Sequence, residues 1–336
     1  MSIYIFEASE LDRRYLSEYL AGEELKFIPG PLTNISQLGS NLNDIEALCV
    51  FVHSRVDATI IDSLPNLRLV ATRSTSYDHI NVPACESRGV PVSTVPTYGE
   101  NTVAEHTFAL ILALSRNIHK AYMRTSSGDF SLVGLQGFDL KGKTIGIIGV
   151  GHIGLHTVQI AKGFGMNVIA HDPVPNPTAA EILGYQYTHL DDLLSRSDIV
   201  SLHATYSKAT HHMIGEHNIG RIKRGALLIN TARGELVDTC ALLKALDDGV
   251  LRGAGLDVVE GEEVFSEEKQ LIGNQDASSD RLRMALRNLS LLKRPDLIVT
   301  PHIAFDSSEA MKRILATTVE NIRGLRTGCA MNTVHT

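Results

Sequence analysis

The sequence contains few cysteines and no closely spaced pair of them. Cys49, Cys85, Cys240 and Cys329 are far apart, and no CxxC motif is present. In a chain of 336 residues, four scattered thiols argue against a disulfide framework and are typical of a protein in a reducing compartment. We therefore expect a cytoplasmic protein.

Long apolar runs and an excess of basic residues are also missing. No apolar run approaches the roughly 18 residues of a membrane-spanning helix. The opening MSIYIFEASELDRRY lacks the basic and apolar regions of a signal peptide, so we expect none. The net charge of −7 argues against a nucleic-acid-binding face, which is basic. We expect neither a membrane nor a nucleic acid as a partner.

Short apolar runs alternate with helical patterns along almost the whole chain. We expect strands at residues 3–6, 47–52, 69–71, 144–148, 167–170, 199–203, 226–230 and 297–300. We expect helices at residues 9–20, 102–116, 153–164, 190–194, 239–247 and 308–325. This alternation is typical of the α/β class, in which helices cover both faces of parallel sheets. A length of 336 residues predicts two domains, because one core rarely exceeds about 250–300 residues.

A glycine-rich segment directly follows one of the predicted strands. KTIGIIGVGHIG runs from that strand into three glycines and then into a helical pattern. The first glycine permits a tight turn, the second lets the backbone approach a pyrophosphate, and the third allows close helix–strand packing. Amides at a helix N-terminus favour an anion. The residues expected to bind a dinucleotide here are Gly149, Gly151, His152, Ile153 and Gly154.

An acidic residue ends the next predicted strand. Asp172, in NVIAHDPVP, lies eighteen positions after Gly154. A carboxylate there can accept hydrogen bonds from the adenosine ribose hydroxyls and repel a 2′-phosphate. No arginine or lysine occurs between residues 171 and 181 to bind that phosphate. We therefore expect NAD, not NADP, as the cofactor.

An arginine and a histidine follow two further predicted strands. Arg233 follows the buried run of LLINTARGEL, and His302 follows the strand of LIVTPHIAF. Ligands bind beyond the carboxyl ends of parallel strands, so both side chains are expected at the ligand. The guanidinium fork suits a carboxylate, and histidine is a common proton donor near neutral pH. This pair fits the reduction of a carbonyl by hydride transfer.

Several acidic residues are candidates for a carboxylate beside His302. The segment GAGLDVVEGEE places Asp257, Glu260, Glu262 and Glu263 after the end of a strand. A carboxylate beside a histidine favours the protonated imidazole and fixes its orientation. The residues alone do not decide which carboxylate is the partner.

The other histidines have plainer interpretations. His211, His212 and His217 in THHMIGEHNIG are not spaced as a convergent zinc site, so we expect no metal. His106, in VAEHTFALILAL, is expected to be a packed structural residue, and the apolar face of its helix is a candidate for packing between subunits or lobes. The polar segment at 261–280 is expected to be a surface insertion.

Taken in order, GVGHIG, NTARGELVD, GLDVVEGEE and TPHIAF resemble the D-isomer-specific 2-hydroxyacid dehydrogenases, most closely their D-lactate dehydrogenase branch. RSTSYDHIN, VPTYGENTVAEHTFALILAL and THHMI extend the resemblance over nearly the whole chain. It implies two Rossmann-like or flavodoxin-like lobes with parallel sheets. Residues 1–100 and 304–336 would form a discontinuous substrate (catalytic) domain around an inserted NAD-binding Rossmann domain at 101–303. It also implies a homodimer formed through the NAD-binding domains.

The resemblance implies an NAD-dependent, reversible reduction of a small 2-oxo acid to the D-2-hydroxy acid, with pyruvate and D-lactate as the first candidate pair. NADH would supply the hydride and His302 the proton. The catalytic residues that it implies are Arg233, Glu262 and His302. The implied substrate residues are Thr75, Ser76, Tyr98, Arg233 and Phe305, and the further implied cofactor contacts are Thr205, Thr231 and Asp257.

Several residues depart from the family pattern. Ser76 stands where relatives often have glycine, His53 where lactate-type members commonly carry tyrosine, and Thr205 where proline is frequent. Gly99 and Glu100 replace the usual residues at the predicted crossing between the domains. These departures leave glyoxylate or hydroxypyruvate and phosphoglycerate open as substrates. An NAD-sensing binding protein of the corepressor type, which resembles this family, is the alternative without turnover.

Overall fold

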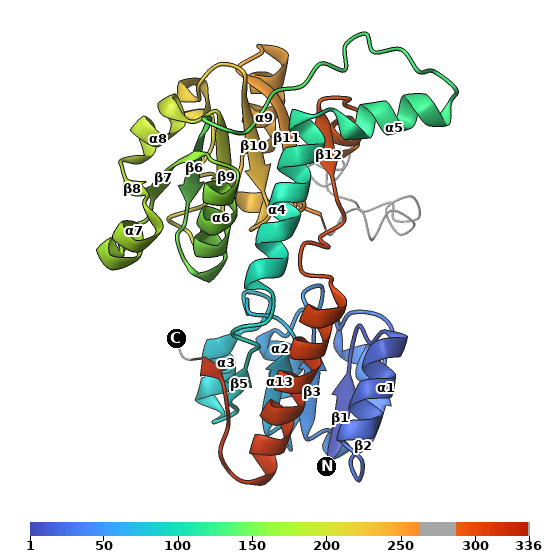
Figure 1. The fold of residues 1–336 in the computed structure, drawn as a ribbon. Helices are drawn as coiled ribbons and strands as arrows, with labels where there is room; N and C mark the ends of the chain where they lie inside the picture. The colour runs from blue at the N-terminus through green and yellow to red at the C-terminus, as the bar shows by residue number, and fades with distance from the viewer. Residues whose placement is uncertain (263–286, 335–336) are drawn as a thin grey trace. The chain divides into compact units, whose positions relative to one another are not determined.

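The computed structural model describes residues 1–262 and 287–334, and the chain divides into two compact units (Figure 1). The first unit comprises Met1–Tyr98 and Ser307–Thr336, and the second comprises Gly99–Asp306. The predicted surface insertion at 261–280 lies outside the described residues, except for Gly261 and Glu262. Glu263 lies outside them as well.

The first unit contains a six-stranded sheet. Its strands are β1 (Ser2–Ile5), β2 (Glu24–Phe27), β3 (Ala47–Val50), β4 (Leu69–Thr72), β5 (Val92–Ser93) and β13 (Thr333–Val334). Its helices are α1 (Glu10–Tyr19), α2 (Ala58–Asp62), α3 (Val82–Ser87) and α13 (Ser308–Arg326), with 3₁₀ turns at Ile35–Leu38 and Leu42–Asp44. The strand order is β13-β5-β4-β3-β1-β2, and only the β13–β5 pair is antiparallel.

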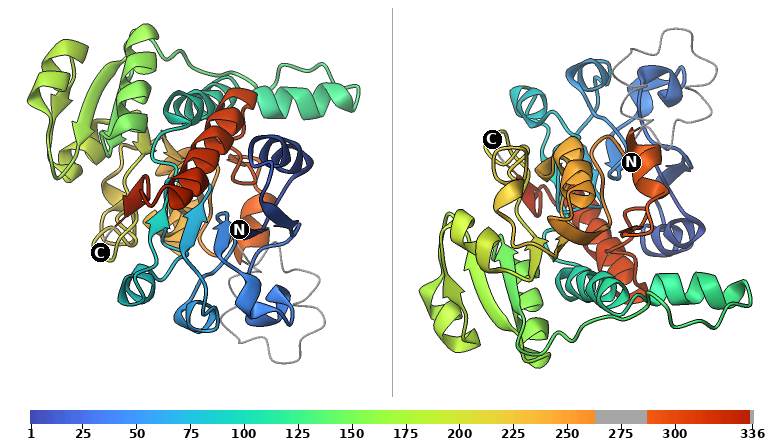
Figure 2. Two further views of the ribbon diagram at one scale, coloured as in Figure 1. Left: turned by 90° about the horizontal axis from the view of Figure 1, so that it is seen from below. Right: turned by 90° about the horizontal axis from the view of Figure 1, so that it is seen from above.

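Alternate residues of β1 and its continuation are buried in two separate cores. Ile3 and Ile5 pack with α1 and α13, whereas Tyr4 and Phe6 pack in the core that contains α2 and α3. Successive side chains of a strand point to opposite faces, so a strand covered on both faces reads as a continuous apolar run. The helix α13 covers one of these faces (Figures 1 and 2).

The second unit contains a seven-stranded, entirely parallel sheet. Its strands are β6 (Thr144–Ile148), β7 (Asn167–His171), β8 (Gln186–Tyr187), β9 (Ile199–Leu202), β10 (Ala226–Asn230), β11 (Leu251–Leu256) and β12 (Leu297–Val299). Its helices include α4 (Glu100–Ser115), α5 (Ile118–Ser126), α6 (His152–Gly163), α7 (Pro177–Leu183), α8 (Leu190–Arg196) and α9 (Thr239–Asp247), and 3₁₀ turns occur at Ile219–Arg221 and Gly234–Leu236. The order β12-β11-β10-β9-β6-β7-β8 reverses at β6, so β6 and β9 form the switch point where such sheets bind ligands.

The predicted α/β class with parallel sheets is confirmed, and each predicted strand and helix is present with ends shifted by a few residues. The strands β2, β5, β8 and β13 were not predicted. Three of these have two residues each, which is too short for a periodic pattern. Among the helices that the structure describes, none is long and apolar enough to cross a membrane.

The apolar face of α4 packs within its own unit. Phe108, Ile111 and Leu114 are buried in a core with residues of β6 and β10, and α4 contacts α6, β10 and β11. Because a parallel sheet needs cover on both faces, this helix face buries its own sheet. Packing of this helix between subunits or lobes stays a prediction.

Candidate active site

The glycine-rich segment forms a tight turn between β6 and α6. Gly149 has a φ of +90°, and a Cβ there would lie 2.6 Å from the amide nitrogen of Ala204. A Cβ on Gly154 would lie 2.2 Å from the carbonyl oxygen of Gly149, so only glycine lets α6 start this close to the strand. A Cβ on Gly151 would meet nothing within 4 Å, which leaves space beside the backbone.

The N-terminus of α6 fits an anionic group. Gly151 is its N-cap, and within the described part of the chain no side chain caps this end. The first-turn amides belong to His152, Ile153 and Gly154, where unsatisfied N–H groups and the helix dipole favour negative charge. Open space and uncapped amides together suit the pyrophosphate of a dinucleotide.

Asp172 lies directly after β7 and contacts the glycine turn. Its Oδ2 accepts a hydrogen bond from the amide of Val150 at 2.7 Å, and its Oδ1 accepts one from the amide of Val174 at 2.8 Å. The carboxylate is partly exposed and held at the turn by backbone donors. A fixed negative charge there suits ribose hydroxyls and disfavours a 2′-phosphate.

Two threonines with predicted cofactor roles follow neighbouring strands. Thr205 lies in the exposed turn after β9, where its carbonyl accepts a hydrogen bond from the hydroxyl of Thr210 at 2.9 Å. Thr231 directly follows β10 and is buried, with its hydroxyl 2.9 Å from that of Thr107 on α4. Their roles toward the cofactor stay predictions.

The loop that carries Arg233 is fixed by its neighbours. The side chain of Asn230 donates to the carbonyl of Arg233 at 2.8 Å and accepts from the amide of Ala232 at 3.0 Å. A Cβ on Gly234 would lie 2.2 Å from the carbonyl carbon of Val259, so glycine is needed for this contact. Arg233 is half-buried, in extended backbone directly after the strand. Arg233 thus lies directly after the strand, where its Nη1 donates to the carbonyl of Ala232 at 2.7 Å, and its role toward a substrate stays a prediction.

Asp257, directly after β11, is a buried charge. Its carboxylate accepts hydrogen bonds from the hydroxyl of Thr300 (2.5 Å) and the amides of Ile303 (3.0 Å) and Ala304 (2.8 Å). Burial raises its pKa, but hydrogen bonds outweigh this effect, and the pKa of Asp257 is below its ordinary value. The carboxylate thus stays ionised and fixes the loop after β12. Its predicted contact with the cofactor stays a prediction.

His106 on α4 joins this network. Its Nε2 lies 3.1 Å from Oγ1 of Thr300 and 3.4 Å from Oδ1 of Asp257. The sequence predicts a packed residue here, and the structure adds polar partners to it. The local sequence could not indicate these polar partners, because Thr300 is 194 positions from His106.

His302 and Glu262 form a close pair. Nδ1 of His302 lies 2.6 Å from Oε1 of Glu262, and the two side chains are 19% and 29% exposed. His302 has a φ of +54°, which is unusual outside glycine and is found at functional sites. Its amide donates to the carbonyl of Asp257, and its ring lies edge-on to that of Phe305 at 6.4 Å. The structure thus places Glu262 at the histidine.

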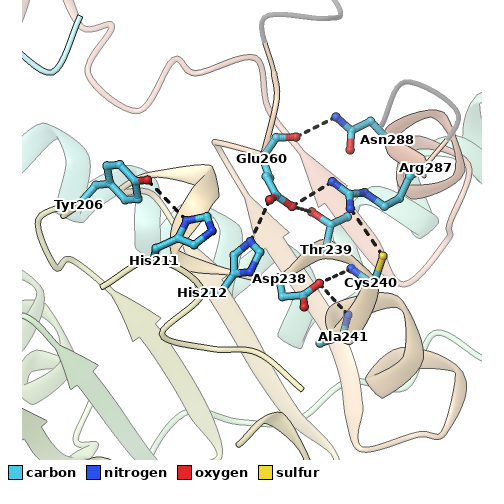
Figure 3. Close-up of polar contacts among 10 residues, drawn as sticks. All are labelled: Tyr206, His211, His212, Asp238, Thr239, Cys240, Ala241, Glu260, Arg287 and Asn288. Atoms are coloured by element: carbon cyan, nitrogen blue, oxygen red, sulfur yellow. Dashed lines mark hydrogen bonds and ion pairs between the residues drawn. The ribbon is translucent and has the colours of Figure 1, made fainter. Parts of the chain in front are cut away.

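Glu260 faces a different histidine. Its Oε1 lies 2.8 Å from Nε2 of His212 (Figure 3). The ring of His211 stacks on that of His212, with centroids 3.9 Å apart. The described residues contain no group of three or more His, Cys, Asp or Glu side chains placed to hold a metal ion. His212 is therefore tied to a carboxylate by a contact that spans 48 positions in the sequence.

The predicted carboxylate-binding residues Thr75 and Ser76 lie in the first unit, in the loop after β4. The hydroxyl of Thr75 donates to the carbonyl of Val95 at 2.8 Å. Just before the loop, Arg73 is buried and pairs with Asp12 at 2.6 Å. Sequence analysis missed this buried pair, whose partner is 61 positions away. The binding of the substrate carboxylate by Thr75 and Ser76 stays a prediction.

The other predicted substrate residues have these positions. Tyr98 lies at the end of the first stretch of the first unit, where its carbonyl accepts a hydrogen bond from Nε of Arg313. Phe305 lies in the second unit, beside His302. His53 has its amide 3.0 Å from the carboxylate of Glu7, which sequence analysis did not single out. The roles of these residues toward a substrate stay predictions.

Comparison with known proteins identifies the family. The family model described as "D-isomer specific 2-hydroxyacid dehydrogenase, NAD binding domain" matches residues 108–304. The D-lactate dehydrogenase of Escherichia coli (strain K12) is 34% identical over 333 residues, which are 98% of each chain. A glyoxylate reductase of Thermococcus litoralis is 35% identical over 288 residues, 82% of this chain and 80% of the relative.

A solved structure agrees with these relatives. The D-lactate dehydrogenase of Aquifex aeolicus, solved with NAD and lactic acid, superposes with a TM-score of 0.87 at 35% identity, covering 98% of this chain and 96% of that one. Its likeness extends over both units. The chain therefore belongs to the D-isomer-specific 2-hydroxyacid dehydrogenase family and is an NAD-dependent oxidoreductase that interconverts a 2-oxo acid and a 2-hydroxy acid.

Proposed function

We propose that the protein reduces pyruvate to D-lactate, with His302 as the proton donor. The observation that carries the proposal is the 2.6 Å contact between Nδ1 of His302 and Glu262 at the end of the parallel sheet. With Nδ1 engaged by the carboxylate, Nε2 is the ring nitrogen left to deliver a proton. In the protonated ring that the reduction requires, Nδ1 donates to the carboxylate of Glu262.

The remaining roles follow from the chemistry of the residues. Arg233 binds the substrate carboxylate through its fork and polarises the C2 carbonyl oxygen. The backbone amides of Thr75 and Ser76 bind the same carboxylate, and Tyr98 and Phe305 line the side-chain pocket, as the family resemblance implies. When bound at the glycine turn and Asp172, NADH supplies the hydride. Asp257 holds the loop that carries His302.

The substrate is tested by initial rates with NADH and a panel of 2-oxo acids. We expect the highest kcat/KM with pyruvate, and D-lactate as the product in a chiral assay. Glyoxylate is the second candidate, because a glyoxylate reductase is among the relatives. A higher kcat/KM for glyoxylate or hydroxypyruvate would replace pyruvate, and NADH binding without any turnover would favour a sensing protein.

We also propose a cytoplasmic homodimer. The helix α5 projects away from the sheet of its own unit (Figures 1 and 2) and exposes Ile118, Tyr122 and Met123. Exposed apolar side chains gathered on one helix are typical of an interaction surface. All four cysteines have free thiols, which suits a reducing compartment. Light scattering should give twice the chain mass of 36.6 kDa, and Tyr122→Asp should shift it toward the monomer.

A further inference from the structure

The carboxylate of Glu260 is held by three separate segments of the second unit (Figure 3). Oε1 contacts Nε2 of His212, and Oε2 accepts hydrogen bonds from Oγ1 of Thr239 (3.1 Å) and Nη2 of Arg287 (2.9 Å). The backbone carbonyl of Glu260 accepts a further bond from Nδ2 of Asn288 at 3.0 Å. The side chain is only 14% exposed. Glu260 is therefore fixed from several directions.

Glu262 follows Glu260 in a tight turn. The intervening Gly261 has a φ of +70°, a conformation that favours glycine. The amide of Glu262 donates to the carbonyl of Val259 at 3.1 Å, and the amide of Val259 donates to Oε2 of Glu262 at 3.3 Å. Because the turn closes on itself in this way, a displacement of Glu260 is transmitted to Glu262.

The same turn supports the loop of Arg233. A Cβ on Gly234 would lie 2.4 Å from the amide nitrogen of Glu260, so the two backbones are in direct contact. On the other side, the amide of His212 donates to the carbonyl of Glu235 at 2.8 Å. The turn of Glu260 thus lies directly against the loop that carries Arg233.

Charge strengthens this arrangement. Arg287 gives Glu260 a cationic partner, and hydrogen bonds between ionised groups are roughly twice as strong as neutral ones. Within the part of the chain that the structure describes, Glu260 is the carboxylate paired with the partly buried Arg287, so removing it takes away that counter-charge, which costs more than losing a neutral contact. The anchor thus depends on the charge of Glu260 as well as on its shape.

We propose that Glu260 is a positioning residue: its carboxylate anchors the Val259–Glu262 turn to His212, Thr239 and Arg287 and holds Glu262 against Nδ1 of His302. The consequence for turnover rests on the proposed function. The geometry at His302 does not rest on the proposed function, because it can be measured without turnover. Two readouts therefore separate a failure of this proposal from a failure of the proposed function.

The first readout is a double-mutant cycle on kcat for pyruvate reduction. We expect Glu260→Ala to lower kcat by about ten- to a hundredfold, as a displaced catalytic group does. In the Glu262→Gln background the same change should cost less than about threefold, because Glu260 acts through Glu262. The matched control is Glu216→Ala, an exposed glutamate of the same unit, with kcat unchanged.

The second readout is the ¹⁵N signal of Nδ1 of His302 in protein labelled at histidine, assigned with His302→Gln. Loss of Glu262 changes the hydrogen bond of Nδ1, so Glu262→Gln should move this signal. Glu260→Ala should move it in the same direction, and Glu216→Ala should not. Glu260→Gln, which keeps the shape and removes the charge, replaces the alanine variant if that variant does not fold.

The outcomes separate clearly. Additive losses in the cycle, or an unmoved Nδ1 signal in the Glu260 variant that folds, would overturn the positioning role. Non-additive losses with a moved signal support it. If the wild type reduces no 2-oxo acid, the proposed function is wrong. The Nδ1 signal of His302 would still decide whether Glu260 is a positioning residue.

Discussion

The second unit contains two histidine–glutamate pairs with the same chemistry and different surroundings. His302 lies 2.6 Å from Glu262, and His212 lies 2.8 Å from Glu260. Both histidines have left-handed backbone, with φ of +54° and +50°. The difference is in the carboxylates: Glu260 also binds Arg287 and Thr239, whereas Glu262 binds a backbone amide. A carboxylate paired with an arginine, such as Glu260, is suited to anchor a loop. A carboxylate paired with a histidine, such as Glu262, is suited to stabilise a proton on the imidazole ring.

The largest expected effect separates the two histidines. His302→Gln should lower kcat/KM for pyruvate by about 10²–10⁴-fold, the usual contribution of a positioned acid or base. His212→Gln should cost less than about tenfold, because Thr239 and Arg287 still hold Glu260. NADH affinity, measured by fluorescence titration, should be unchanged in both variants. Equal losses in the two variants would erase the distinction between the pairs.

Arg233, whose loop abuts the turn of Glu260, should give the next largest effect. Arg233→Lys keeps the charge and loses the two-pronged geometry. We expect kcat/KM for pyruvate to fall by about a hundredfold, since a charged hydrogen bond contributes about 1.5–3 kcal/mol. NADH affinity serves as the internal control. Normal turnover with weakened NADH binding would assign Arg233 to the cofactor instead.

A third carboxylate at a strand end sharpens the comparison, because Asp172 is held by the backbone amides of Val150 and Val174. It should therefore govern cofactor choice and not proton transfer. We expect the wild type to prefer NADH over NADPH by at least about tenfold in kcat/KM, or roughly 1.4 kcal/mol. Asp172→Ser combined with Val174→Arg should relax the preference. Equal use of both cofactors by the wild type would contradict this role.

The last expected effect is on stability, and it concerns a histidine in contact with a hydroxyl. Nε2 of His203 lies 2.9 Å from Oγ of Ser201, and burial lowers the pKa of His203 from 6.5 to about 4. Between these values the unfolded chain binds a proton that the folded protein does not, so stability falls as the pH is lowered. The loss from pH 7.5 to 4.5 should reach at most about 3 kcal/mol in urea unfolding. His203→Gln should lose less, and an equal loss would refute the assignment.

Much of the cofactor site could be read from local sequence. The turn at Gly149, Gly151 and Gly154 needs glycine for reasons of backbone geometry, and those reasons act within a few residues. Arg233 and His302 were singled out because the carboxyl ends of parallel strands lie at one edge of the sheet. The fold class followed in the same way from alternating local patterns.

The partners of these residues could not be read in the same way. Glu260, Glu262 and Glu263 look equivalent in the sequence, and the residues alone left the choice open. Because the chain turns at Gly261, Glu262 contacts His302 and Glu260 contacts His212. Each histidine is 40 or more positions from its glutamate in the sequence. The contact of Gly234 with Val259 also joins residues that are not neighbours in the sequence. Such choices depend on tertiary packing, which a single sequence does not display.

The anchor of Glu260 carries its own labelling site. Cys240 is exposed, is the sole cysteine within the sequence of the second unit, and has its Sγ 3.5 Å from Nη1 of Arg287. After Cys329→Ser removes the other exposed thiol, a maleimide dye would attach at this single position. The dye would lie beside the guanidinium that holds Glu260. Its fluorescence could then follow the anchor in real time while substrate and product exchange.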